Sequence, residues 1–249
     1  MNMAAAVQRH IPDHGYRDRW IAIAQSNDVP PRHIFHGRLL GTELAVWRDD
    51  AGRINVWENR CPHRNVRLTI GSHRGDQLKC RYHGWSYATG TGRCVLIPAH
   101  PNETPPERIG VKTFPAMEHA GLIWTALGQP GGAPAALPQV AGGYDPLRSV
   151  VMQAPAARVA EALERTPFRI DGSDATNTKQ ENRRLDPLTI SVTGAGETIV
   201  WLVQPADLAK TIVHGIWCPD RRGNTNAVAR TRQLHDALQA LRDTLASGR

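Results

Sequence analysis

The chain has 249 residues, with 30 Lys+Arg against 23 Asp+Glu and a formal net charge of +7. Its 41% hydrophobic residues and seven tryptophans exclude a disordered chain. Four cysteines are too few for a disulfide scaffold, no apolar run approaches the ~18 residues that cross a bilayer, and the N-terminus lacks the apolar core of an export signal. We therefore expect a cytoplasmic protein with no membrane partner.

The first half of the chain is predicted to be an all-β domain. Residues 16–127 alternate between short apolar runs and turns, with no sustained helical period. Residues 49–52, Asp-Asp-Ala-Gly, are a hairpin turn signal. The expected strands are residues 20–24, 44–47, 54–57, 95–97 and 121–125.

The second half is predicted to be α+β. Residues 128–144 are rich in Pro and Gly and without charge, which indicates a linker or an ordered strap. After it we expect a helix at 156–163, a hairpin of strands 188–192 and 198–203 across residues 194–196, and a third strand at 210–217. The terminal helix has its leucines on one core-facing side, at Leu234, Leu238, Leu241 and Leu245. The expected division is 1–127, 128–144 and 145–249.

Two short segments, separated by sixteen residues, each contain one cysteine and one histidine. A tetrahedral zinc site would take all four side chains on one ion. A Rieske centre instead places two thiolates on one iron of a [2Fe–2S] unit and two histidines on the other. Because zinc sites more often pair two cysteines in one knuckle, the spacing favours iron–sulfur, with zinc as the alternative. The four candidate ligands are Cys61, His63, Cys80 and His83.

The residues around these ligands carry a family resemblance. Cys61-Pro62-His63-Arg64 and Cys80-Arg81-Tyr82-His83-Gly84-Trp85 resemble the Rieske family at both loops. With the flanking segments 41–49 and 92–99, residues 16–127 look like the N-terminal domain of Rieske non-haem iron oxygenases, in the manner of an alpha subunit. The loops lack the extra disulfide-forming cysteines of the respiratory Rieske proteins. The resemblance implies a [2Fe–2S] cofactor, and leaves Cys94 and Cys218 as core residues.

The resemblance also implies a second, mononuclear iron. In the family, the Rieske domain receives electrons from a reductase or ferredoxin. It passes them to an iron held by two histidines and a carboxylate in a C-terminal catalytic domain, usually across a subunit boundary in a trimer. The family's histidines would fall near Thr166 and Asp171, and after residue 128 the chain has only His214 and His235, 21 residues apart. We therefore expect a shortened catalytic-like domain without catalytic residues and without a mononuclear iron of its own.

Three functions follow. The first is an electron-transferring subunit in a hetero-oligomeric oxygenase, whose partner subunit holds the iron that hydroxylates or demethylates an aromatic or heterocyclic substrate. The second is a complete oxygenase with unusual ligands, for example His214 with Asp171 or Glu164. The third is a Rieske ferredoxin-like carrier.

The positive charge suggests an acidic partner protein rather than nucleic acid. The densest basic stretch coincides with the metal motif, and no nucleic-acid-binding signature accompanies it. A basic rim around a redox centre would attract an acidic electron-transfer partner. If Arg60, Arg64 and Arg81 point inward, their charge should also favour the reduced form.

Overall fold

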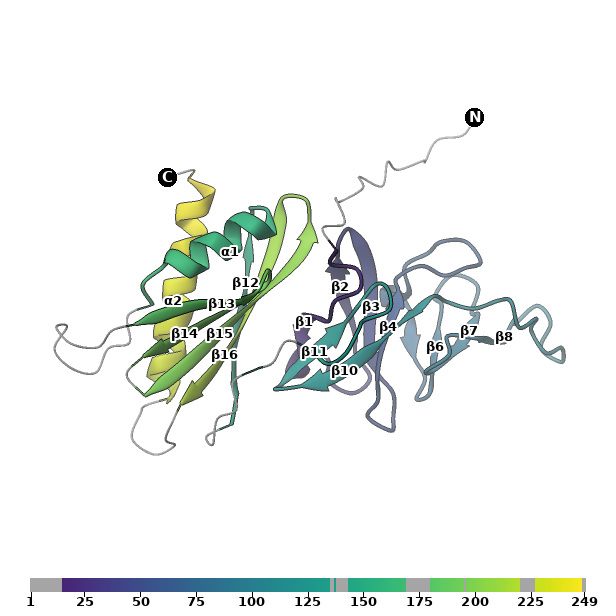
Figure 1. The fold of residues 1–249 in the computed structure, drawn as a ribbon. Helices are drawn as coiled ribbons and strands as arrows, with labels where there is room; N and C mark the ends of the chain where they lie inside the picture. Colours follow the sequence, from purple (N-terminus) through teal and green to yellow (C-terminus); the bar gives the residue numbers. More distant parts are fainter. Residues whose placement is uncertain are drawn as a thin grey trace.

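The computed structural model describes residues 15–134, 137, 143–168, 180–194, 196–219 and 227–247. In these residues the chain forms four antiparallel sheets and two α-helices. Figure 1 shows the two halves side by side, with three sheets in the first half, and one sheet and both helices in the second. The predicted fold class, an all-β domain followed by an α+β domain, is confirmed.

The first half contains strands β1 to β11. One sheet has three strands in the order β1-β11-β10, and the other two have four strands each, ordered β2-β3-β4-β9 and β5-β6-β7-β8. Two 3-10 helices, η1 (Ser26–Asp28) and η2 (Leu68–Ile70), lie between strands. The strands are β1 (Ile21–Gln25), β2 (Ile34–Leu39), β3 (Thr42–Arg48), β4 (Ile54–Glu58), β5 (Ser72–His73), β6 (Gln77–Lys79), β7 (Ser86–Ala88), β8 (Cys94–Leu96), β9 (Thr113–Phe114), β10 (Ala116–His119) and β11 (Leu122–Thr125).

The second half is one five-stranded sheet, in the order β12-β16-β15-β14-β13, with two helices. The predicted hairpin and third strand correspond to β14, β15 and β16, and both predicted helices are present. The two outer strands of this sheet, β12 and β13, were not predicted. The elements are β12 (Asp145–Met152), α1 (Ala156–Arg165), β13 (Glu181–Asp186), β14 (Thr189–Gly194), β15 (Glu197–Asp207), β16 (Lys210–Pro219) and α2 (Ala227–Ala246).

Strand β15 is buried on both faces. Val200 and Leu202 pack in one cluster with Leu122 and Trp124 of β11, so one face of the sheet meets the first half of the chain. Successive side chains of a strand point to opposite faces. Trp201 accordingly joins the cluster that includes leucines of both helices. The sheet therefore lies between the helices and the first half of the chain. Because both faces of β15 are covered, its sequence is a continuous apolar run rather than an alternation of apolar and polar residues.

Helix α2 packs through its predicted leucine face. Leu234, Leu238 and Leu245 are buried, and Leu241 is partly buried against the same cluster. At the start of the helix, the Arg230 guanidinium is buried and bonded to the carboxylate of Glu197 on β15. The second carboxylate oxygen accepts a hydrogen bond from the Trp217 indole. A buried ion pair thus fixes the helix to the sheet.

The two halves also meet through backbone hydrogen bonds. The turn between β2 and β3 donates from Leu40 N to Pro205 O at 2.8 Å and from Gly41 N to Ala206 O at 2.9 Å. In the connecting segment, Gly128 N donates to Arg17 O at 2.8 Å and the Trp20 indole donates to Gly132 O at 3.0 Å. The described part of residues 128–144 is therefore held against the first half. Neither described helix is long and apolar enough to cross a bilayer.

Candidate metal centre

The four predicted ligands line one pocket in the first half of the chain. Cys61, His63, Cys80 and His83 line the same small pocket, together with Arg64, Val66, Tyr82 and Trp85. The imidazole centroids of His63 and His83 are 4.7 Å apart. The structure thus brings together side chains that lie on two loops, one after β4 and one between β6 and β7.

The first loop is closed by a pair of backbone hydrogen bonds. Cys61 N donates to Val66 O at 2.8 Å, and Asn65 N donates to Cys61 O at 2.8 Å. Asn65 has a φ of 55°, in the left-handed region that asparagine tolerates better than most residues. The short turn therefore projects the Cys61 and His63 side chains from a rigid backbone.

The second loop repeats this arrangement. Cys80 N donates to Trp85 O at 2.8 Å, and Gly84 N donates to Cys80 O at 3.2 Å. Gly84 has a φ of 73°, and a Cβ there would lie 3.1 Å from Pro98 Cγ and 3.2 Å from Lys79 Cε. The positive φ favours glycine at this point, and a Cβ would require its neighbours to shift by a few tenths of an ångström. The two loops are related structures, each presenting one thiol and one imidazole.

Burial divides the donors into two pairs. Cys61 and Cys80 are each 2% exposed, whereas His83 is exposed and His63 is half-buried. The thiols therefore lie on the protein side of the pocket and the imidazoles on the solvent side. This is the division a Rieske centre uses, with two thiolates on one iron and two histidines on the other.

Hydrogen bonds reach both thiols. The Tyr87 hydroxyl on β7 lies 3.1 Å from Cys61 Sγ, and the backbone amides of Tyr82 and His83 donate to Cys80. Burial raises the pKa of the Cys80 thiol, against the lowering effect of those amides. Burial likewise raises the pKa of Tyr87, so its hydroxyl keeps its proton. Donors around a metal-bound sulfur orient the ligand and tune the metal. Tyr87 was not predicted; its place in the strand directly after the second loop was the available signal.

An aromatic ring packs against each imidazole. The Trp85 ring stacks on His63 with centroids 4.4 Å apart and planes at 5°. Tyr82 packs on His83 at 3.9 Å between centroids. Desolvation lowers the pKa of His63, and the nearby His83 and Arg64 lower it further. A neutral imidazole is the form that binds a metal.

The geometry fits a binuclear centre better than a single ion. Within the residues that the structure describes, no group of three or more His, Cys, Asp or Glu side chains converges to hold one metal ion. A tetrahedral zinc site would need four donors at one point. Donors divided two and two, with buried thiols and outer imidazoles, fit the two irons of a [2Fe–2S] cluster.

The arginines around the motif take different positions from those expected. Arg60 does not face the pocket, because its guanidinium lies 2.8 Å from the Glu43 carboxylate. Arg64 lines the pocket and Arg81 is exposed beside it. Among the described residues, neither Arg64 nor Arg81 forms an ion pair. The expected contribution of positive charge therefore comes from these two residues, whereas the charge of Arg60 is offset by Glu43.

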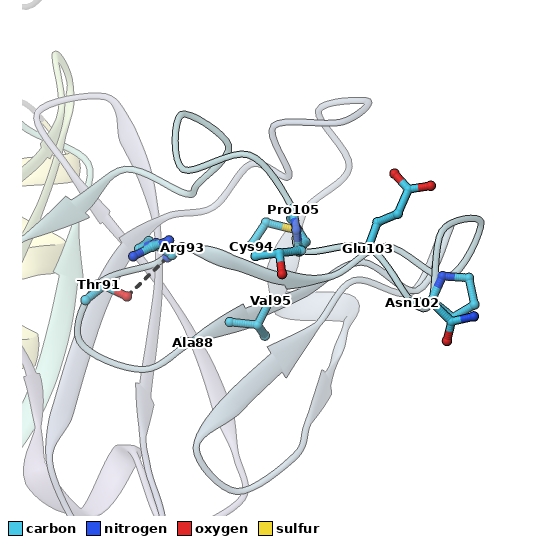
Figure 2. Close-up of a pocket in the computed structure, with 10 residues that line it drawn as sticks. Ala88, Thr91, Arg93, Cys94, Val95, Asn102, Glu103 and Pro105 are labelled. Atoms are coloured by element: carbon cyan, nitrogen blue, oxygen red, sulfur yellow. Dashed lines mark hydrogen bonds between the residues drawn. The ribbon is translucent and has the colours of Figure 1, made fainter.

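The remaining cysteines lie in the core. Cys94 and Cys218 are 4% and 0% exposed. Figure 2 shows Cys94 on the wall of a second pocket of about 490 Å³, opposite the loop that carries Glu103. The charged groups of that region have partners, since Arg93 pairs with Glu107 and Glu103 with His100. Burial raises the pKa of the Cys94 thiol. The prediction of a core residue is confirmed for both cysteines.

The second half places the other candidate ligands apart. His214 is buried on β16 with both ring nitrogens hydrogen-bonded, Nδ1 at 2.8 Å from Ser149 Oγ and Nε2 at 2.7 Å from Gln204 Oε1. Burial lowers its pKa to about 4, so it is a neutral core residue. Glu164 on α1 pairs with Arg184 at 2.8 Å.

The other positions considered for the iron have different settings. His235 contacts Gln239 on α2, and Thr166 ends α1 by donating to Ala162 O at 2.7 Å. Asp171 lies outside the described residues. No described residue therefore completes a set of two histidines and a carboxylate with His214.

Comparison with known proteins identifies the first half. The Rieske [2Fe–2S] domain family matches residues 19–115. The oxidoreductase NdmD of Pseudomonas putida is 40% identical over 215 residues, which are 83% of this chain and 37% of that protein. The iron–sulfur subunit TsaM1 of the toluene-4-sulfonate monooxygenase system of Comamonas testosteroni is 36% identical over 114 residues, 46% of this chain and 32% of that protein. The chain thus spans about a third of the length of these relatives.

The solved structures extend the similarity to the second half. The structure of NdmA from Pseudomonas putida CBB5 matches with a TM-score of 0.72 at 19% identity, covering 92% of this chain and 81% of that one. At this identity the match shows the fold, and its coverage of 92% of the chain extends the similarity into the second half. Residues 19–115 thus match the Rieske [2Fe–2S] domain family, and over 92% of its length the chain has the fold of the NdmA structure.

Proposed function

We propose that the chain is the electron-transfer component of a multicomponent oxygenase. It would accept an electron from a reductase or ferredoxin and pass it to a mononuclear iron on a partner subunit. Residues 1–127 are the proposed Rieske domain, 128–144 the connecting segment and 145–249 the shortened catalytic-like domain. Cys61, His63, Cys80 and His83 are the proposed ligands of the cluster, which when bound supplies one-electron redox chemistry. The substrate class, aromatic or heterocyclic, and the cytoplasmic location remain predictions.

One observation carries the proposal. The His83 side chain is exposed at the surface while the thiols are buried, so the imidazole side of the pocket is where a partner protein can approach. An electron-transfer centre needs such access on one side. The alignment with NdmD, an oxidoreductase by name, exceeds the length of the Rieske domain and therefore extends into the second half.

The surface beside the imidazoles favours an acidic partner. Arg64 and Arg81 are exposed and form no ion pair with another described residue. Apolar contact area lies next to them, since Tyr82 lines the same pocket and is 62% exposed. Unpaired charge speeds the encounter with an oppositely charged protein, and exposed aromatic residues stabilise the contact once formed.

Reversing this charge should slow electron entry. In the double variant Arg64→Glu/Arg81→Glu, we expect the second-order rate of cluster reduction by a reduced plant-type ferredoxin to fall at least about tenfold at low ionic strength, because electrostatic steering is lost. The rate of the unaltered chain should fall as salt is added, and that of the variant much less. Stopped-flow absorbance under anaerobic conditions measures both.

A matched control separates local from total charge. Arg158→Glu/Arg183→Glu makes the same charge change at exposed positions of α1 and β13, away from the pocket. We expect it to keep the rate within about twofold. Equal losses in both double variants would contradict electron entry at the Arg64 and Arg81 surface.

The main alternative is a ferredoxin-like carrier. Its motivation is the second half, which has the sheet and helices of an oxygenase fold but, in its described residues, no three-ligand group. Purification from the native host distinguishes the two functions. A subunit should elute with a partner in constant stoichiometry through ion exchange and gel filtration, whereas a carrier should separate from it.

A further inference from the structure

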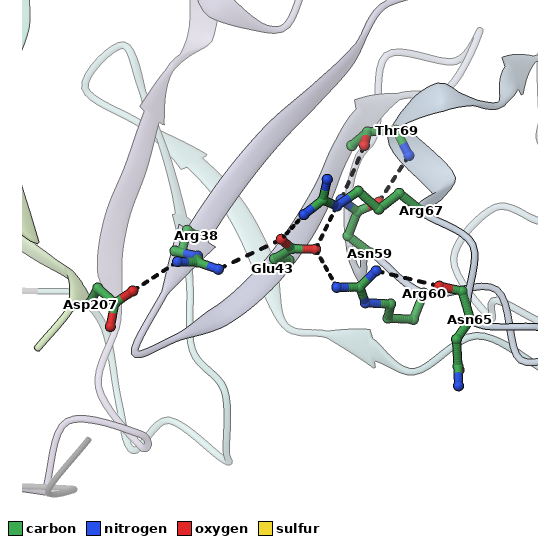
Figure 3. Close-up of polar contacts among 8 residues, drawn as sticks. All are labelled: Arg38, Glu43, Asn59, Arg60, Asn65, Arg67, Thr69 and Asp207. Atoms are coloured by element: carbon green, nitrogen blue, oxygen red, sulfur yellow. Dashed lines mark hydrogen bonds and ion pairs between the residues drawn. The ribbon is translucent and has the colours of Figure 1, made fainter. Parts of the chain in front are cut away.

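A single carboxylate next to the first ligand loop contacts three arginines. Glu43 lies on β3, and its side chain is 9% exposed. Arg67 bonds it through two nitrogens, at 3.0 and 2.6 Å, and Arg60 lies at 2.8 Å. Arg38 is 3.6 Å away from the other side. Figure 3 shows the three guanidinium groups converging on this carboxylate.

The carboxylate is ionised and its charge is shared. The hydrogen bond from Arg67 is the main reason why the pKa of Glu43 lies below its usual value, and the positive charges of Arg60 and Arg67 lower it further. A carboxylate held by charged donors makes stronger bonds than one in water. One negative charge therefore offsets part of three positive ones.

The arginines bracket the first ligand loop. Arg60 directly precedes Cys61, and its Nη1 also lies 3.4 Å from Asn65 O inside the loop. Arg67 directly follows Val66, where the loop closes. Glu43 thus holds both ends of the segment that presents Cys61 and His63.

Two hydrogen bonds between Asn59 and Thr69 also support the first ligand loop. Thr69 N donates to Asn59 Oδ1 at 2.9 Å, and Asn59 Nδ2 donates to Thr69 Oγ1 at 3.1 Å. The series of ion pairs continues beyond the loop, because Arg38 Nη1 lies 2.8 Å from the carboxylate of Asp207, the last residue of β15. Among the described residues, no acid pairs with Arg81 or Lys79 of the second loop. The arrangement is therefore specific to the first loop.

We propose that Glu43 is a positioning residue that fixes the first ligand loop and sets the reduction potential of the centre by offsetting the charge of Arg60 and Arg67. This inference goes beyond the proposed function. It requires a cluster on the four ligands and does not depend on which protein receives the electron.

The sign of the effect follows from charge. Reduction adds one negative charge to the centre, so a nearby positive charge favours the reduced form and a nearby negative charge opposes it. Glu43→Gln keeps the size of the side chain and one acceptor oxygen, but removes the charge and replaces the other oxygen by an NH2 group. The potential should rise, with the reduced-to-oxidised ratio at a fixed ambient potential increasing roughly threefold to tenfold, where tenfold corresponds to about 59 mV for one electron.

The opposite variant makes the test specific. Arg67→Gln removes a positive charge from the same network and should shift the potential in the negative direction by a similar factor. A loop that is merely loosened would not give opposite shifts in the two variants. Glu164→Gln is the matched control, because Glu164 also pairs with an arginine but lies on α1 in the second half; its potential should stay unchanged.

The experiment is a spectroelectrochemical titration of the intact holo chain, at low and high salt, with iron and sulfide measured for each variant. Shifts of opposite sign that shrink at high salt support the inference. Shifts of the same sign, or none in either variant, would overturn it. If Glu43→Gln loses its cluster, the sign in Arg67→Gln decides, and an unchanged potential there also overturns it. An unaltered chain that forms no Rieske cluster would instead contradict the proposed function.

Discussion

Replacing Cys80 with serine is expected to give a chain without a [2Fe–2S] cluster. Cys80 is one of two buried thiols in the pocket, and thiolates are the ligands that iron–sulfur clusters require. A serine hydroxyl stays protonated near neutral pH and is a poor ligand for the sulfur-bound iron. Iron and acid-labile sulfide per chain should fall from about two each to near zero, and the visible absorbance should be lost.

The control for this variant is Cys94→Ala. Cys94 is buried to a similar degree and belongs to the same hydrophobic cluster as Cys61 and Cys80. Its thiol donates a weak hydrogen bond to Leu96 O, at 3.6 Å. We expect the full iron content and an unchanged electron paramagnetic resonance spectrum. Full iron in Cys80→Ser, or loss of the cluster in Cys94→Ala, would show that the ligand assignment is wrong.

The second large effect concerns the second half of the chain. Glu197→Ala should destabilise the folded chain by about 3–5 kcal/mol, because it breaks the buried ion pair between Glu197 and Arg230. The Trp217 indole loses its acceptor in the same variant. For a chain of this size the midpoint of thermal unfolding should fall by roughly 10 °C. Circular dichroism melts of the intact chain measure the change.

Two companion variants make this result interpretable. Glu161→Ala removes an exposed glutamate from α1 and should change stability by less than about 0.5 kcal/mol. The double variant Glu197→Met/Arg230→Met removes both charges and should recover most of the loss, since apolar replacement of a buried ion pair is often neutral. A double variant as unstable as Glu197→Ala would mean that lost packing, rather than the broken ion pair, accounts for the destabilisation.

The candidate site was predictable because its ligands are local in sequence. Each loop supplies a Cys and a His within four residues, and the turn-forming Asn65 and Gly84 follow at the same distance from their cysteines. Local patterns of this kind are visible without the fold. Tyr87 and Glu43 were missed for the converse reason. Their roles depend on strand placement, which brings the Glu43 carboxylate to arginines 17 and 24 positions away.

The fold was predictable where apolar periodicity is long. The leucine face of α2 and the apolar runs of β14 to β16 are such cases. Strands β5 to β7 have only two or three residues each, too few for a period of two to be recognised. Strand β13, Glu-Asn-Arg-Arg-Leu-Asp, lies at the edge of its sheet and alternates between exposed and half-buried residues, so its apolar signal is absent.

Arg60 was expected to favour the reduced form if it pointed toward the cluster, but its guanidinium is paired with Glu43 instead. In the sequence it stands directly before Cys61, and only the register of β3 against β4 brings Glu43 into reach of its guanidinium. Neighbouring charge in sequence is therefore a poor guide to the field at the centre. Arg64 and Arg81 remain as the unpaired charges beside it, among the residues that the structure describes.

In the proposed function, this chain carries a Rieske cluster and no mononuclear iron of its own. This expectation is tested most directly by iron and acid-labile sulfide per chain in the purified holo protein, with an electron paramagnetic resonance spectrum after reduction. We expect about two irons, two sulfides and a Rieske-type signal for each chain. A third iron would contradict transfer to a partner subunit, and a colourless protein with stoichiometric zinc would contradict the cluster itself.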